Sequence, residues 1–169
     1  AKSSEVLKLD GTTSKKAVTK LKVANPELWD LANPALYKLH TKIIKNGHQI
    51  DATTTNTGFR QFTFDPNKGF ALNDKWMKVK GVCLHHDAGV LGAAMYKEVW
   101  RRRLINLKSI GVNAIRTSHN PQATAFYDLC DEIGLLVMDE AFDEWEHPKR
   151  KWLEGWNVGT PGYEGTYDF

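Results

Sequence analysis

The second half of the chain alternates strand and helix patterns, and this order restricts the fold more than any other feature. The patterns predict strands over residues 76–83, 113–116 and 135–138, separated by helices over residues 95–110 and 121–133. Asn120 is a candidate N-cap, with Pro121 at the first helical position, and Gly134 ends the helix. Because residues 135–138 are all apolar, we expect that strand to be buried on both faces. The series predicts parallel strands joined by right-handed crossovers.

The first sixty or so residues have a different pattern, which is typical of antiparallel β-structure. Alternating or aromatic-rich stretches predict four strands, at residues 18–23, 36–44, 48–55 and 59–64. Asn46 and Gly47 lie between the second and third of these strands, and both tolerate a positive φ, as a two-residue hairpin turn requires. Short strands separated by turns indicate a β-sandwich, although four strands are too few for a complete one. We therefore expect part of a sandwich.

Composition places the chain among ordinary globular proteins. Of its 169 residues, 41% are hydrophobic, which is enough for a sizeable core, and no apolar run approaches the roughly 20 residues that cross a bilayer. The net charge is only +3, and we interpret the densest cationic block, Arg101–Arg103, as the exposed face of a helix. A nucleic-acid site would need clustered cations with stacking aromatics. We therefore expect neither a nucleic-acid nor a membrane partner.

The two cysteines, Cys83 and Cys130, form neither a disulfide framework nor a C-x-x-C motif. Both lie in apolar stretches of the sequence, so we predict buried, reduced thiols.

Polar and ionisable side chains follow each predicted parallel strand, at the edge of the sheet where such folds bind ligands. The three sets are His85–Asp87, Arg116–Asn120, and Asp139 and Glu140 with Asp143, Glu144 and Glu146 close behind. A single histidine at a strand end is more often structural, and an acidic pair can simply cap a helix. Three successive sets are harder to explain in that way. Together with Trp145, Trp152 and Trp156 they indicate a site for a polyhydroxylated ligand, whose hydroxyls need hydrogen-bonding partners and whose C–H faces stack on indoles.

Several ordered motifs in the chain carry a family resemblance. They are residues 111–121 (GVNAIRTSHNP), 127–134 (YDLCDEIG) and 136–140 (LVMDE), preceded by residues 29–37, 58–60 and 80–82. These motifs resemble glycoside hydrolase family 2, the family of β-galactosidases, β-glucuronidases and β-mannosidases, over roughly residues 25–150. The resemblance implies an α+β multidomain fragment. Residues 1–64 would be the C-terminal part of an immunoglobulin-like β-sandwich, and residues 65–169 the first three βα units of a (β/α)8 catalytic barrel.

The resemblance also implies roles for the strand-end residues. Arg116 and His119 would line the sugar subsite, where the histidine contacts ring hydroxyls as the oxocarbenium-like transition state forms. Asp139 would hydrogen-bond near the bottom of the pocket. Asn120 would also bind substrate, although it replaces a tyrosine that is common in relatives.

Two further motifs concern the substrate and a metal. His85 and Asp87 match a turn of the family whose aspartate reaches substrate hydroxyls. Residues 143–148 (DEWEHP) are most similar to β-galactosidase-like members, and this favours a terminal β-galactoside as substrate. Glu144 falls where some β-galactosidases have a magnesium ligand, but the accompanying histidine has no clean match. We expect no required cofactor, with Mg²⁺ or another divalent cation as the candidate in the full-length enzyme.

We expect the catalytic groups of the family to lie outside this chain. Retaining glycosidases use two carboxyl groups about 5 Å apart, a nucleophile and a general acid/base. In this family both are glutamates on later barrel strands, the acid/base directly after an asparagine, and no Asn-Glu dipeptide occurs here. A barrel typically needs about 250 residues, so we expect an internal piece of a larger glycosidase that is inactive alone. Its open sheet edge and uncovered sheet face predict self-association or dependence on the remainder of the enzyme.

Two other classes of function remain open from the sequence. One is a non-catalytic carbohydrate-binding or interaction module, in which the strand-end residues bind a sugar but never cleave it. The other is a metal-dependent hydrolase on an unrelated barrel, which would bind its metal through His85, His86, Asp139 and Glu144. Within family 2, β-glucuronidase and β-mannosidase specificities are the alternatives to β-galactosidase.

Overall fold

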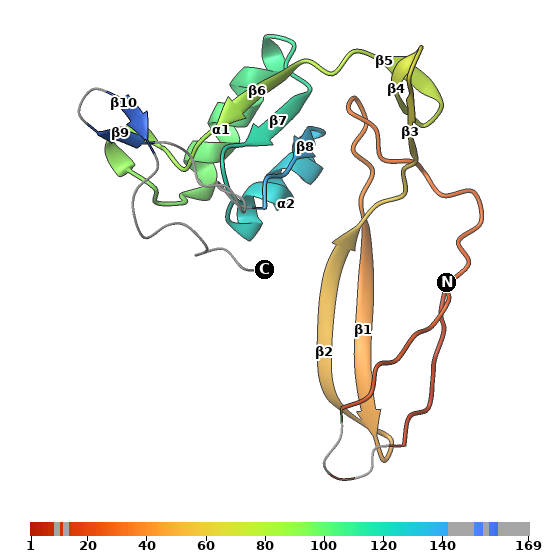
Figure 1. The fold of residues 1–169 in the computed structure, drawn as a ribbon. Coiled ribbons are helices and arrows are strands. Elements are labelled where there is room, and N and C mark those ends of the chain that lie inside the picture. Colours follow the sequence, from red (N-terminus) through yellow and green to blue (C-terminus); the bar gives the residue numbers. More distant parts are fainter. Residues whose placement is uncertain (9–10, 12–13, 142–150, 154–155, 159–169) are drawn as a thin grey trace.

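The computed structural model describes residues 1–8, 11, 14–141, 151–153 and 156–158. Within these ranges the chain forms four small β-sheets, two α-helices and one 3₁₀ helix. An antiparallel hairpin and a three-stranded antiparallel sheet precede a parallel α/β unit (Figure 1). A last hairpin joins β9 (Lys151–Leu153) to β10 (Trp156–Val158). No helix in the described part of the chain is long and apolar enough to cross a membrane.

The hairpin consists of β1 (Tyr37–Lys45) and β2 (His48–Thr57), paired antiparallel over their length. Its turn is Asn46-Gly47, with φ of 50° and 79°, so the predicted hairpin is confirmed. It extends away from the α/β unit (Figure 1). Its apolar side chains are largely exposed, among them Leu39, Ile43, Ile44 and Ile50.

The predicted strand at residues 18–23 is wrong, because the chain there is irregular. Val18 is 68% exposed, and Leu21 and Val23 are also exposed, so the alternating apolar residues have no surface to bury against. A strand needs a partner for its backbone N–H and C=O groups, and the described residues pair no segment with this one. Of the four predicted sandwich strands, the second and third form the β1–β2 hairpin, and the fourth overlaps a strand at Phe62–Asp65.

The next sheet is antiparallel, in the order β3-β4-β5, with strands β3 (Phe62–Asp65), β4 (Gly69–Leu72) and β5 (Lys75–Met77). The predicted strand at residues 59–64 therefore begins later, and β3 crosses residue 64, where the sequence predicts the domain boundary. The predicted strand at residues 76–83 is divided between β5 and the first parallel strand. Asn113 holds this break, since its side chain accepts from Lys80 N at 2.7 Å and donates to Lys78 O at 2.9 Å.

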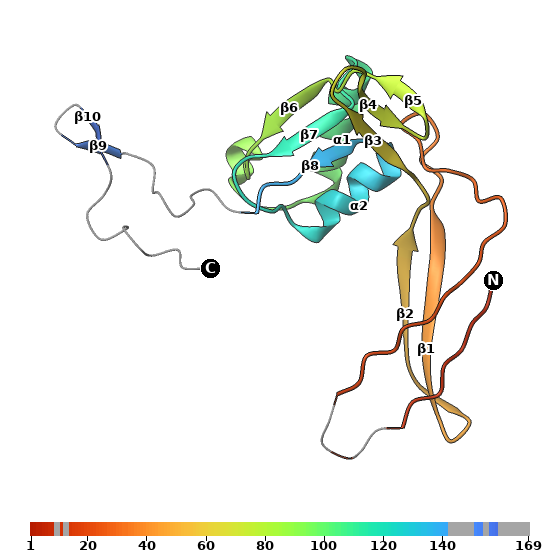
Figure 2. The same cartoon turned by 45° about the vertical axis from the view of Figure 1, so that its right-hand side comes forward.

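The α/β unit has the predicted order of elements. It comprises β6 (Gly81–Leu84), the 3₁₀ helix η1 (Gly89–Leu91), α1 (Lys97–Ser109), β7 (Ala114–Thr117), α2 (Thr124–Ile133) and β8 (Leu136–Met138). The strands pair in parallel in the order β6-β7-β8, which confirms the predicted parallel pairing, and they lie side by side in Figure 2. Helix α2 begins later than predicted. Ala123 is its N-cap instead of Asn120, because residues up to Ala123 are not yet helical.

One face of the parallel sheet forms the core. Leu84 and Ile115 from the strands pack with helix residues, of which the most buried are Leu104, Phe126, Leu129 and Cys130. Removal of these apolar side chains from water is the dominant stabilising contribution to such a unit. Phe126 is fully buried and meets the Trp100 ring edge to face, with 5.5 Å between the centroids.

The other face of this sheet is uncovered in the described part of the chain. Cys83, Arg116 and Met138 lie in register across it, and all three are exposed; we call them the open face. Two predictions are therefore wrong. Strand β8 is not buried on both faces, since Met138 is 65% exposed, and Cys83 is an exposed thiol. Cys130 is free and buried, as predicted.

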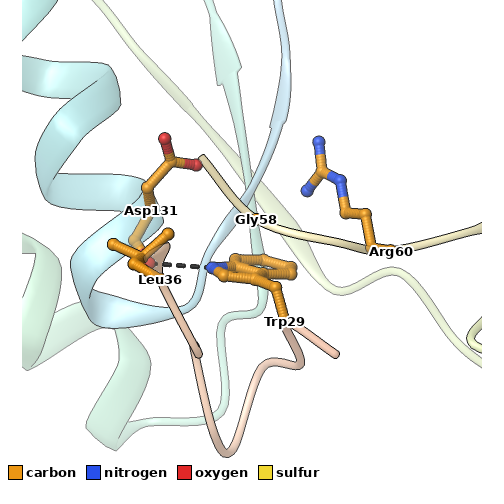
Figure 3. Close-up of a pocket in the computed structure, with 5 residues that line it drawn as sticks. All are labelled: Trp29, Leu36, Gly58, Arg60 and Asp131. Atoms are coloured by element: carbon orange, nitrogen blue, oxygen red, sulfur yellow. Dashed lines mark hydrogen bonds between the residues drawn. The ribbon is translucent and has the colours of Figure 1, made fainter. Parts of the chain in front are cut away.

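The segment before β1 is attached to the far end of α2. The Trp29 indole N–H donates to Asp131 O at 2.9 Å, and the Arg60 guanidinium lies 4.9 Å from the centre of that ring. These residues, with Leu36 and Gly58, line a cavity of about 170 Å³ (Figure 3). Asp131 is in the last turn of α2, which leads into the amino end of β8. This contact between Trp29 and the end of α2, which we call the junction, therefore lies with its cavity at the opposite end from the carboxyl ends of the parallel strands.

Candidate sugar-binding site

The carboxyl ends of β6, β7 and β8 bring four polar side chains together. Parallel pairing places these strand ends at the same edge of the sheet. His85 follows β6, Arg116 is in β7, His119 follows β7, and Glu140 follows β8. We call these four residues the strand-end cluster.

Glu140 is the centre of the strand-end cluster. Its Oε1 accepts a hydrogen bond from Arg116 Nε at 2.5 Å and pairs with Arg116 Nη2, while its Oε2 lies 3.1 Å from His119 Nδ1. The His119 ring meets the His85 ring edge to face, with 5.3 Å between centroids. The peptide bond between Ser118 and His119 is cis. One carboxylate thus orients two side chains from β7 and the loop after it.

The charges of the cluster stabilise one another. Burial raises the pKa of Glu140. The hydrogen bonds from Arg116 and His119, and their charges, lower it by a larger amount, so the net pKa lies below the ordinary value. The pKa of Arg116 is raised by its hydrogen bonds to Cys83, at 3.5 Å from Nη1 to Sγ, and to Glu140. At neutral pH the cluster therefore holds a charged carboxylate paired with a guanidinium.

Asp139 points to different partners from those of Glu140. Its Oδ1 accepts hydrogen bonds from Thr117 Oγ1 and from Tyr127 OH, both at 2.7 Å. The Tyr127 oxygen also accepts from Gln122 N at 2.8 Å. Burial, followed by the hydrogen bond to the Asp139 carboxylate, raises the pKa of Tyr127 to about 12, so the phenol stays a neutral donor.

Other predicted site residues lie outside this hydrogen-bonded group. Asp87 accepts a hydrogen bond from Gly89 N at 2.8 Å, at the start of η1. Asn120 and His86 are exposed. Glu144, together with the tryptophans at positions 145, 152 and 156, falls where the structure describes no side chains. The prediction that Asp87 and Asn120 bind substrate stays a prediction.

The sequence places Glu140 among the strand-end residues but predicts no individual role for it, although a signal for one exists. Residues two apart in a strand point to the same face. Met138 is paired with Arg116, so Glu140, two residues later, is expected on the Arg116 side and Asp139 on the other. Thr117 and Tyr127 carry no comparable signal, because their roles depend on how α2 packs.

The described residues contain no group of three or more histidine, cysteine or acidic side chains that could hold a metal ion. Glu144, the predicted magnesium ligand, lies outside those residues. The metal site therefore stays a prediction.

Comparison with known proteins identifies the family. The sequence model described as glycosyl hydrolases family 2, TIM barrel domain, matches residues 66–150, and that described as glycosyl hydrolases family 2 matches residues 1–60. The chain belongs to glycosyl hydrolases family 2. The predicted family is thus confirmed, and the α/β unit lies within the TIM barrel match.

Curated relatives of this family 2 chain bear the names of two activities. A β-galactosidase of Bacteroides ovatus is 50% identical over 129 residues, which are 76% of this chain and 15% of that protein. A putative β-glucuronidase of Formosa agariphila is 44% identical over 144 residues, 82% of this chain and 14% of that protein. The chain thus spans about one seventh of the length of these relatives.

Solved structures resemble this family 2 chain in fold as well. A β-glycosidase from Bacteroides vulgatus superposes with a TM-score of 0.72 at 44% identity, over 75% of this chain and 16% of that one. A β-glucuronidase from Parabacteroides merdae gives a TM-score of 0.69 at 34% identity, with the same coverage of each chain.

Proposed function

We propose that this chain is part of a retaining β-glycosidase and supplies part of its sugar-binding site, with terminal β-galactosides as the substrate. The observation that carries the proposal is the strand-end cluster, in which Glu140 orients Arg116 and His119 at the carboxyl ends of the parallel strands. Such edges are where barrel enzymes bind substrate. The family membership and the names of the relatives support the glycosidase activity.

In this proposal the chain binds and orients the sugar, and other parts of the enzyme perform the bond cleavage. The guanidinium of Arg116 and the ring of His119 offer donors to sugar hydroxyls, and Glu140 offers acceptors. Glycoside cleavage with retention needs a nucleophile and an acid/base carboxyl about 5 Å apart. We assign those two groups to later barrel strands, so the 169-residue chain alone would be inactive.

The pairing of charges favours a neutral sugar over a uronic acid. A uronate carboxylate placed at Arg116 would be repelled by the negative charge of Glu140, which a neutral sugar would not be. Arg116 is paired with Glu140, whose pKa is lowered by that contact. A β-glucuronide therefore gains less from this cluster than a β-galactoside does. β-Glucuronidase specificity remains the second candidate, because several relatives carry that name.

The test uses the longer enzyme that contains this chain, with nitrophenyl β-galactoside, β-glucuronide and β-mannoside as substrates. Wild-type enzyme should cleave the galactoside fastest. Arg116→Ala and His119→Ala should each lower kcat/KM by about 100-fold or more, since misplaced substrate costs about that much. Arg102→Ala, on the exposed side of α1, is the matched control and should leave kcat/KM unchanged.

The remaining outcomes separate the alternatives. Full activity of both variants would overturn the assignment of the cluster to the sugar site. Fastest cleavage of the glucuronide would transfer the proposal to β-glucuronidase. Galactose binding in calorimetry without hydrolysis of any of the three substrates would identify a non-catalytic carbohydrate-binding protein.

A further inference from the structure

A buried threonine connects the two strands that carry the cluster. Thr117, the last residue of β7, is completely buried. Its Oγ1 donates to Asp139 Oδ1 at 2.7 Å and accepts from Glu140 N at 2.9 Å. The backbone pairing between β7 and β8 ends at Arg116 and Met138. The Thr117 hydroxyl therefore continues the connection of the strands beyond their last paired residues.

Helix α2, which packs on the core face of the sheet, supports the same connection. The Tyr127 hydroxyl donates to Asp139 Oδ1, the oxygen that also accepts from Thr117. Two donors on one oxygen fix the carboxylate more firmly than one donor would. Because Gln122 N also donates to the Tyr127 oxygen, the loop after β7 belongs to the same network.

We propose that Thr117 is a positioning residue of the sugar site, supported by Tyr127 and Asp139. Its hydroxyl holds the backbone of Glu140, and the Glu140 carboxylate in turn holds Arg116 and His119. This inference rests on the proposed function and deepens it, since it concerns how the same site is kept in its binding geometry. In this arrangement Asp139 acts on Glu140 through the Thr117 hydroxyl.

Thr117→Val in the longer enzyme removes both hydrogen bonds and keeps the size of the side chain. We expect kcat/KM on the aryl glycoside to fall about 10- to 100-fold, because a misplacement of about 1 Å in an active site can cost about 100-fold. Thr117→Ser retains the hydroxyl and should recover most of that loss. Thr63→Val, on the exposed strand β3, makes the same chemical change elsewhere and should leave kcat/KM unaltered.

A second variant separates positioning from general damage to the fold. Tyr127→Phe should cause a smaller fall, because Thr117 still holds Asp139, and the effects of the two changes should be non-additive in the double variant. If Thr117→Ser is as impaired as Thr117→Val, the hydroxyl is not the cause and the proposal fails.

A structural measurement keeps this inference distinct from the proposed function. In a crystal structure of the Thr117→Val enzyme, the Glu140 carboxylate should leave Arg116 Nε or His119 Nδ1, whether or not the enzyme proves to be a galactosidase. An unmoved Glu140 would overturn the positioning role. A displaced Glu140 in an enzyme without glycosidase activity would leave the positioning role intact and overturn the proposed function.

Discussion

Asp139 and Glu140 are neighbours of the same chemical type, yet they have different partners. Strand alternation sends Glu140 to the open face, where it meets Arg116 and His119, and sends Asp139 toward Thr117 and α2. A carboxylate that accepts from a cation stays charged at lower pH. The alternation of side chains along the strand thus places Glu140 where it can face a ligand and Asp139 where it hydrogen-bonds within the protein.

The two cysteines should differ sharply in reactivity. Cys83 is exposed, whereas Cys130 is only 1% exposed and burial raises its pKa to about 12. Because the thiolate is the reactive form, a disulfide reagent at pH 8 should modify one thiol rapidly and the second only after unfolding. Cys83→Ser should remove the rapid phase. Two rapid thiols in the folded wild-type chain would contradict this burial of Cys130.

At the scale of elements, α2 connects the site to the segment before β1. Its Tyr127 reaches Asp139 at the carboxyl ends of the strands, and its last turn accepts the indole hydrogen bond of Trp29. Gly134 ends the helix in the left-handed region, with φ of 81°. A Cβ at that position would lie 2.5 Å from Leu31 O. The end of α2 is therefore shaped around the preceding segment.

Gly134→Ala should destabilise the chain more than Gly111→Ala does. Both glycines have positive φ, at 81° and 94°, so alanine costs about 1–2 kcal/mol at either position. Only Gly134 also meets Leu31 O, whereas a Cβ at Gly111 has open space around it. Urea unfolding should show an extra loss of about 1 kcal/mol or more for Gly134→Ala. Equal losses would show that Leu31 moves away freely.

The two helices are joined by an ion pair whose contribution should depend on pH. Arg101 Nη2 lies 2.6 Å from Glu132 Oε2, and this hydrogen bond lowers the pKa of Glu132 from its ordinary value. The stabilisation is present above the unfolded-state pKa and is lost as the pH falls through the lower folded-state pKa. Glu132→Gln should cost about 0.5–1 kcal/mol at neutral pH.

The same substitution should cost less at about pH 3, below the unfolded-state pKa, because protonation of Glu132 removes the charge on which the ion pair depends. Urea unfolding at both pH values measures the difference. Glu98→Gln is the matched control, because Glu98 is 84% exposed and 4.0 Å from Arg101. A pH-independent cost of Glu132→Gln would show that packing, and not charge, is responsible.

Local sequence patterns predict the elements that are determined by their own periodicity and turn residues. They fail where an element depends on contacts with a distant segment. Both helices, the hairpin and the parallel order follow from periodicity and turn residues, as observed. Residues 18–23 alternate as a strand should but form no strand pairing in the described structure. In the site, Arg116 and His119 were predicted together, while Glu140 needed strand register and Thr117 needed tertiary packing.

For the molecule as a whole, the main liability is a sheet covered on one side. The open face exposes Met138 and Cys83 around Arg116, and β6 and β8 have unpaired outer edges in the described structure. Such edges and faces favour association with other chains. The exposed isoleucines of the β1–β2 hairpin add a second apolar surface.

We expect the 169-residue chain to self-associate through its parallel sheet. Sedimentation coefficients should rise with protein concentration, and Met138→Lys should reduce that rise by placing a charge on the open face. Val90→Lys, at a fully exposed position in η1, adds the same charge elsewhere and should have little effect. A monomer at every concentration would show that neither the edges nor the open face drives association.

The junction at the far end of α2 has a consequence for how the molecule opens. Lys108 donates to Leu31 O and to Ile133 O, and the indole of Trp29 donates to Asp131 O. The segment before β1 and the end of α2 are therefore joined directly by Trp29 and also through Lys108 of α1, which binds a carbonyl oxygen in each. Neither can unfold locally without exposing the other. Amide hydrogen exchange at residues 29–35 and 131–135 should accordingly follow one cooperative opening. The hairpin side and the barrel side of the chain should then exchange with the same opening free energy.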